Sequence, residues 1–214
     1  MLSANAMTDD SGRLWKFSEG LTGVCIVGVL WLLCSLPIIT AGASTTAMYT
    51  VFLRNIRSGQ VQKKYVKPFF ASFKQSFRES TVLWLIQLAV SAVLGVDVYY
   101  YYRLGGGRTY LAMEVVILSL LAVVIMIFCY AFPLTALYRN TVKETLIESV
   151  QHAFYSWPWS LLALAVSVAV PFLLTKGLWY LVLIAGGAVG IANSYIMVHA
   201  LKREIPRGHG PAKF

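Results

Sequence analysis

Few side chains within the apolar stretches of this chain could carry chemistry, and two of them are carboxylic acids. Asp97 stands about a turn and a half before the end of one apolar stretch, and Glu114 about a turn after the start of the next. A charge is costly to bury in lipid, so an acid in such a stretch is a candidate functional residue. We expect either pairing with Arg103 and Arg108 in the intervening loop, which would tie a helical hairpin, or a shallow polar site that faces outward.

Neutral polar side chains in the same stretches could form hydrogen bonds between helices. Gln87 and Asn193 join Asp97 and Glu114 as the residues of a candidate intramembrane polar site. A path for a small solute needs several polar groups at matching depth. Such a path predicts that the following five residues converge in one cavity: Gln87, Ser91, Ser119, Ser167 and Asn193.

The sequence predicts no catalytic residue, no cofactor and no metal site. The three cysteines lie inside apolar stretches without a CxxC pair, which is typical of small buried thiols. The three histidines lack the spacing of HExxH, and neither a GxSxG nor a Walker A sequence occurs. We therefore expect a protein that is not an enzyme.

Long apolar stretches must position these residues. The first, 21–40, contains no charge, and as a helix it is long enough to cross the roughly 30 Å hydrocarbon core of a bilayer. The other stretches of this kind, with at most one acid each, are 80–102, 110–138, 157–175 and 178–201. The pattern predicts an all-α, polytopic transmembrane helical bundle with five spans.

The stretch 38–56 leaves a choice open. It follows Pro37, which removes a backbone donor and should kink or end the first helix. It has no charge before Arg54 and is rich in Ala, Ser, Thr and Gly, which allow close helix contact in lipid. It is either a short sixth span or the long cytoplasmic end of the first helix.

The composition favours a single integral membrane domain, 1–214, with polar tails at 1–19 and 202–214. Hydrophobic residues make up 58% of the chain and charged residues only 13%, against about 25% charged in soluble domains. Basic cytoplasmic loops explain the net charge of +9 better than nucleic-acid binding, because no nucleic-acid motif accompanies it. We expect no cleavable signal peptide, and Met7 could be an alternative start.

The distribution of Lys and Arg predicts the orientation. With five spans, one side carries 13 of these residues and the other 5, whereas with six spans the split is 15 to 3. By the positive-inside rule, both basic connectors and the C-terminus face the cytoplasm in either case. Only the side of the N-terminus stays open.

Two connectors between apolar stretches have the periodicity of amphipathic helices. In the first, Lys67–Ser80, four phenylalanines fall on one face with two cations beside it, namely Phe69, Phe70, Phe73 and Phe77 with Lys74 and Arg78. In the second, Thr141–Tyr155, the residues of one face are Val142, Leu146, Ile147, Val150 and Phe154. Such helices could contact membrane lipids, dock on a cytoplasmic partner or simply lead the chain into the next span.

A short sequence echo suggests that the chain has two related halves. Thr46–Tyr49 (TAMY) returns as Thr135–Tyr138 (TALY), and each copy follows a Pro-containing apolar stretch and precedes a connector. Duplicated halves are common in membrane proteins.

Three segments resemble the YesL-type family of small bacterial integral membrane proteins, whose function is unknown. They are CSLPIITAG at Cys34–Gly42, the TAMY segment, and the connector Phe69–Phe77 that precedes a Trp-bearing span. The resemblance covers most of the chain and is most specific over about residues 31–86. Ser44 departs from it, since the family more often has Pro there. The resemblance implies a bacterial cell-membrane protein that accompanies ABC-type sugar permeases, and it supplies no catalytic residues.

Two functional hypotheses follow. The first is a non-enzymatic accessory or regulatory component of a carbohydrate-uptake transporter, whose connectors contact a permease subunit or membrane lipids. The connectors lack the Gly of a permease's own coupling loop, so the permease itself is not expected. The second hypothesis is a small stand-alone transporter or channel for a small solute. The oligomeric state stays open.

Overall fold

The computed structural model describes residues 20–58, 64–104, 108–138, 140–175 and 182–201, and every element within these ranges is helical. The first helix is Gly20–Ser35. The others are η1 (Ile38–Thr40), α2 (Ala41–Ser58), α3 (Val66–Gln75), α4 (Phe77–Leu104), α5 (Arg108–Leu137), α6 (Val142–Tyr155), α7 (Trp157–Thr175) and α8 (Val182–Leu201). The tails expected at 1–19 and 202–214 lie outside the described residues.

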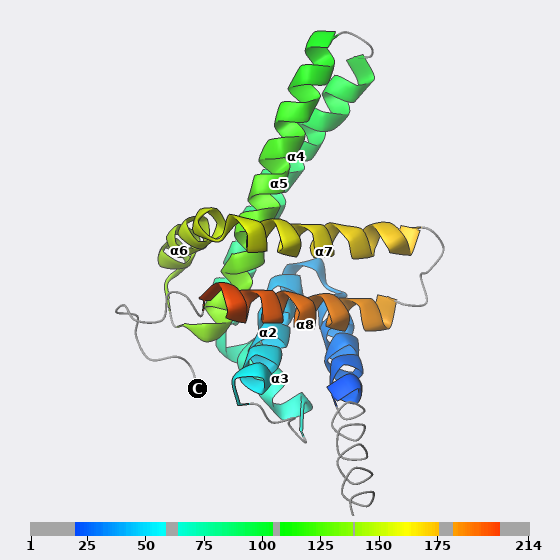
Figure 1. The fold of residues 1–214 in the computed structure, drawn as a ribbon. Coiled ribbons are helices and arrows are strands. Elements are labelled where there is room, and N and C mark those ends of the chain that lie inside the picture. The colour runs from blue at the N-terminus through cyan, green and yellow to red at the C-terminus, as the bar shows by residue number, and fades with distance from the viewer. Residues whose placement is uncertain (1–19, 59–63, 105–107, 139, 176–181, 202–214) are drawn as a thin grey trace, which may run out of the picture.

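The chain reverses direction around Pro37, so 21–40 is not one continuous helix. The first helix ends at Ser35, the short η1 turn follows, and α2 runs back beside the first helix (Figure 1). Thr40 Oγ1 donates to the carbonyl oxygens of Cys34 (2.6 Å) and Pro37 (2.8 Å), which fixes the turn. The interpretation of 38–56 as the end of the first helix is therefore wrong, because a proline that cannot donate a backbone hydrogen bond separates the two helices.

Helices α4 and α5 form a long antiparallel hairpin that projects from the rest of the molecule (Figure 1). They match the apolar stretches predicted at 80–102 and 110–138 to within a few residues at each end. Both are long and apolar enough to cross a membrane, yet only 6% of the apolar window of α4 and 28% of that of α5 are buried within the chain.

Helices α7 and α8 form a second antiparallel pair that runs across the direction of the α4–α5 hairpin (Figure 1). The bounds of α7 are those predicted from the sequence, and α8 begins at Val182 in the described part of the predicted stretch 178–201. Because the two pairs cross, the described helices do not lie along one common axis. The described part of the structure is all-helical as predicted, and two of its helices, α4 and α5, qualify as candidate spans, but the predicted number of five spans is not confirmed.

Helix α2 lies at the centre of the structure and packs against α3, α4, α5 and α8. Its small residues Ala43, Ser44 and Ala47 are fully buried, as are Phe52 and Leu53 toward its end. Small side chains let neighbouring backbones approach closely, and the large buried ones fill the core between the helices. The core is therefore built around the segment that the sequence left undecided.

Candidate functional site

The first connector is positioned by a serine-rich face that the sequence analysis missed. Along α3 and the start of α4, the buried residues are Tyr65, Phe69, Ser72, Ser76 and Ser80. Ser72 Oγ donates to Thr50 Oγ1 (2.7 Å), and Ser80 Oγ donates to Thr46 Oγ1 (2.8 Å), which joins the connector to α2. The repeat of serine every four residues was the available signal, but the phenylalanines dominated the hydrophobic pattern.

The phenylalanine face predicted at 69–77 is divided by the structure. Phe69 is fully buried, and Phe73 is half-buried and packs against the core. Phe70 and Phe77 are 47% and 39% exposed. The four rings therefore do not lie on one exposed surface, because the serine face turns Phe69 inward. Contact of this connector with a partner or with lipid stays a prediction.

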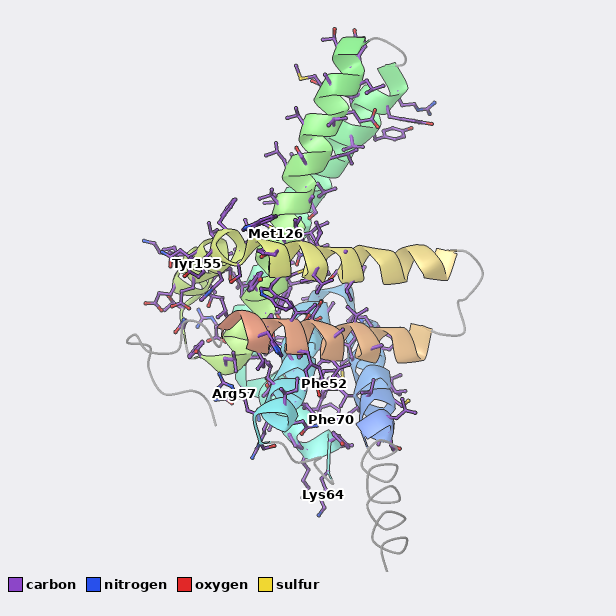
Figure 2. All side chains as sticks on the ribbon, in the orientation of Figure 1. Phe52, Arg57, Lys64, Phe70, Met126 and Tyr155 are labelled. Carbon is purple, nitrogen blue, oxygen red and sulfur yellow. The ribbon has the colours of Figure 1, made fainter. Side chains whose placement is uncertain are left out.

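The outer side of the connector carries both apolar and basic side chains. Val66 is exposed together with Phe70 and Phe77, and the cations Lys67, Lys74 and Arg78 are exposed as well. In Figure 2, Arg57, Lys64 and Phe70 lie at the end of the molecule away from the tip of the α4–α5 hairpin. The candidate contact residues that remain available are therefore Phe70, Lys74, Phe77 and Arg78.

The second connector, α6, is positioned in the same way. Its buried residues, Thr145, Ser149 and Ala153, recur every four positions, whereas Ile147, Val150 and Phe154 of the predicted apolar face are exposed. At its start, Thr141 Oγ1 accepts a hydrogen bond from the Glu144 backbone N–H, and the Glu144 carboxylate accepts one from the Thr141 N–H (2.8 Å). These bonds lower the pKa of Glu144, because they favour its charged form.

The two connectors end in the same local geometry. Ser76 separates α3 from α4, and Ser156 separates α6 from α7. Both serines are buried, and both have a backbone φ of −102°. Each is followed four residues later by a second buried serine, Ser80 or Ser160. In both, the backbone N–H of the second serine donates to the carbonyl of the first (3.0 Å). This similarity extends the TAMY/TALY echo from four letters to a helix, a bend and a second helix.

A buried polar cluster lies where α2, α5, α7 and α8 meet. Asn193 Nδ2 donates to Ser167 Oγ (3.0 Å) and to Tyr49 OH (3.4 Å), and Ser167 Oγ lies 3.6 Å from Cys129 Sγ. Asn193 is almost fully buried, and its Oδ1 accepts no hydrogen bond from the described residues. Tyr49 and Cys129 could not be assigned to this cluster from sequence, because their partners are far away along the chain.

The other polar residues of the predicted path do not join this cluster. Ser119 is exposed and donates to the carbonyl of Val116 in its own helix (2.7 Å). Gln87 and Ser91 lie half-buried on α4, and Gln87 Oε1 accepts no hydrogen bond from the described part of the chain. Of the five residues that a solute path requires, the hydrogen bonds therefore bring together only Ser167 and Asn193.

The two acids of the hairpin are half-buried, whereas most of their neighbours on α4 and α5 are exposed. This places Asp97 and Glu114 on the sides of the two helices that face each other. Arg103 turns to Tyr99 instead: its Nε donates to the Tyr99 OH (2.9 Å), and its guanidinium lies 5.4 Å from the ring centroid. The side chain of Arg108, the other expected partner, lies outside the described residues.

Within the described residues no three His, Cys, Asp or Glu side chains form a group that could hold a metal.

Comparison with known proteins finds a family model that matches one segment of the chain. Residues 24–98 match the model of a family described as "Protein of unknown function, DUF624". The match runs from the first helix through α2 and α3 into α4, and so includes the serine contacts of the first connector. No curated protein and no solved structure matches the chain.

Proposed function

We propose that this chain is a multi-pass protein of the bacterial cell membrane, anchored by the α4–α5 hairpin. The observation that carries the proposal is the exposure of the hairpin. A long apolar helix in a soluble protein is normally a buried core helix, but α4 and α5 are largely exposed. A soluble monomer rarely exposes so large an apolar surface, whereas lipid covers it without cost.

Exposed tyrosines at one end of the hairpin and basic residues at the other support its orientation in the membrane. The tip follows Tyr99, Tyr100 and Tyr102, which are exposed as expected for a membrane-interface belt. The other end continues into the basic connector, which belongs on the cytoplasmic side by the positive-inside rule. In this orientation the tip lies outside the cell, and the C-terminus lies in the cytoplasm.

Within the membrane, we propose a non-enzymatic accessory or regulatory role beside an ABC-type carbohydrate-uptake transporter. The resemblance to the YesL-type family supplies the class of transporter. The hairpin supplies a surface for it, since side chains such as Val93 (63% exposed) and Val96 (66% exposed) are not covered by the rest of the chain. A permease helix could pack there through van der Waals contacts, which drive helix association in lipid.

The alternative is a stand-alone transporter for a small solute. The Tyr49–Cys129–Ser167–Asn193 cluster is the observation that favours it, because it brings polar groups from four helices together. The separate positions of Gln87 and Ser119 count against a continuous path.

Affinity purification of the tagged protein from native membranes in mild detergent, with partners identified by mass spectrometry, tests the accessory role. We expect a sugar-permease subunit in near-equal amount. Val96→Phe, which enlarges an exposed hairpin residue while keeping it apolar, should reduce recovery of the permease. Leu36→Phe is the matched control, since Leu36 is 74% exposed but lies outside the hairpin.

A homo-oligomer without a partner would contradict the accessory role and favour the transporter. Uptake of sugars by reconstituted vesicles would then be measured, with Asn193→Ala as the variant expected to impair it.

A further inference from the structure

The described residues of α2, of α3 and of the segment just before α3 include several cations and no Asp or Glu. Between Glu19 and Glu79 the sequence has no Asp or Glu. The described cations of this segment are all exposed, and they are Arg54, Arg57, Lys64, Lys67, Lys74 and Arg78. Arg54 and Arg57 lie at the end of α2, Lys64 lies just before α3, Lys67 and Lys74 lie on α3, and Arg78 lies in the first turn of α4. Helices α2 and α3 pack against each other. We call this set of exposed cations the basic end.

Along the connector, the exposed residues form two parallel stripes. Val66, Phe70 and Phe77 recur at i, i+4 and i+11, and the cations Lys67, Lys74 and Arg78 recur at i, i+7 and i+11. At 3.6 residues per turn, each set lies along one line of the helix surface. Ser76 lies at the bend between α3 and α4: its backbone N–H donates to the Ser72 carbonyl before the bend, and its own carbonyl accepts from the Ser80 N–H after it (3.0 Å each), so helical hydrogen bonding resumes directly at Phe77 and Arg78.

The order of the stripes suits the surface of a membrane. The serine face is held by α2, the apolar stripe follows it around the helix, and the cations stand on the far side of the apolar stripe. A helix at a lipid interface needs this arrangement, with apolar side chains toward the acyl chains and cations toward the headgroups. Glu79, the nearest acid, is half-buried and stands apart from both stripes along the helix.

The connector also lies at the correct depth if the hairpin crosses the bilayer. Residues 80–102 of α4, at 1.5 Å per residue, cover about 34 Å, slightly more than the roughly 30 Å hydrocarbon core. The cytoplasmic headgroups then begin at about Arg78, directly at the end of α3.

We propose that the basic end, centred on Lys67, Lys74 and Arg78, binds the phosphate headgroups of anionic lipids in the cytoplasmic leaflet. The proposal rests on the proposed membrane insertion and adds the chemistry that the connector recognises. Charge complementarity carries it, since lipid headgroups with negative charge attract Lys and Arg near the surface. The apolar stripe of Phe70 and Phe77 holds the helix at the depth where these contacts form.

The second connector provides an internal contrast. It is positioned by the same kind of buried face and also exposes apolar residues, but its charged residues are Lys143, Glu144 and Glu148. Binding to anionic lipid should therefore belong to α3 and not to α6.

The full chain reconstituted in nanodiscs of phosphatidylcholine, with or without phosphatidylglycerol, tests the proposal by hydrogen exchange of residues 66–78. We expect at least about fivefold slower exchange with phosphatidylglycerol, because a single cation near an anionic surface already shifts an equilibrium by about that factor. Lys67→Gln, Lys74→Gln and Arg78→Gln together should abolish the difference. For a one-to-one comparison, Lys74→Gln should reduce it and Lys143→Gln on α6 should not.

Equal exchange in both kinds of disc would overturn the proposal, and so would a difference that survives in the triple variant. Slower exchange in phosphatidylcholine discs only after addition of a poly-glutamate peptide would assign the basic end to an acidic protein instead of lipid. Alkaline carbonate extraction of native membranes separates the two proposals: release of the protein defeats the membrane insertion, whereas retention with no lipid effect defeats only the lipid site.

Discussion

Gly42 and Gly95 show how differently two helical glycines are placed. A Cβ atom at Gly42 would collide with the Ser80 carbonyl oxygen and approach the Trp84 Cβ to 2.5 Å, whereas a Cβ at Gly95 on the exposed hairpin would meet nothing within 4 Å. Gly42 therefore allows α2 and α4 to approach closely, and Gly95 has no such role within the chain.

We predict that Gly42→Ala destabilises the protein and that Gly95→Ala does not. The first substitution forces two backbones apart, which typically costs about 1–3 kcal/mol. The second removes a flexible residue from a helix and should stabilise it by about 0.5–1 kcal/mol. Thermal unfolding of the two variants in the same detergent measures the difference. Equal melting temperatures would show that α2 and α4 are not in this contact.

Glu144 should make the start of α6 sensitive to acid. Its folded-state pKa is lowered by the hydrogen bonds with Thr141. The stabilisation is therefore fully present above the unfolded pKa, about 4.3, and is lost as the pH falls through the folded value. Hydrogen exchange at residues 142–146 should accelerate on acidification in the native chain. In Glu144→Gln this dependence should disappear, and its persistence would assign the effect to another group.

At the scale of the element, the connectors depend on small polar side chains. Ser72 and Ser80 bond to Thr50 and Thr46, and Ser160 Oγ donates to Tyr130 OH (2.9 Å). The predicted second connector, Thr141–Tyr155, matches α6, whereas the first, Lys67–Ser80, is divided at Ser76 between α3 and the start of α4. Sequence periodicity could not predict which side is buried, because serine is weakly apolar and its burial depends on partners that are distant in sequence.

Phe69 and Phe70 are adjacent in sequence but should respond differently to truncation. Phe69 is fully buried, so Phe69→Ala should lower the free energy of unfolding by about 3–5 kcal/mol. Phe70 is 47% exposed, and Phe70→Ala should have a much smaller effect on stability. Chemical denaturation of both variants in matched micelles provides the comparison. A larger loss for Phe70 would mean that the connector is rotated about its axis.

Ser80→Ala tests the bond between the connector and α2. The substitution removes the buried hydroxyl that donates a hydrogen bond to Thr46 Oγ1. The lost bond should lower the free energy of unfolding by about 1–3 kcal/mol. Ser91→Ala on the same helix is the control, since Ser91 is only half-buried. Similar stability of the two variants would argue against the serine–threonine contact.

At the scale of the whole molecule, the sequence predicts helix positions better than their packing. The bounds of α7 and the approximate bounds of α4 and α5 follow from uninterrupted apolar residues. The crossing of α7–α8 over the hairpin does not, because apolar residues favour burial in any direction. The residues of the candidate polar site are not brought together: Asn193 bonds to Ser167, whereas Asp97, Glu114 and Gln87 lie on the α4–α5 hairpin.

Thiol labelling of the hairpin tip in intact cells tests the central claim that α4–α5 crosses the membrane. In a background with Cys25, Cys34 and Cys129 replaced by Ala, Tyr102→Cys places a thiol near the tip, and Phe70→Cys places one on the connector. We predict that a membrane-impermeant maleimide labels Tyr102→Cys in intact cells but labels Phe70→Cys only after permeabilisation. Labelling of both positions from the same side would contradict a membrane-spanning hairpin.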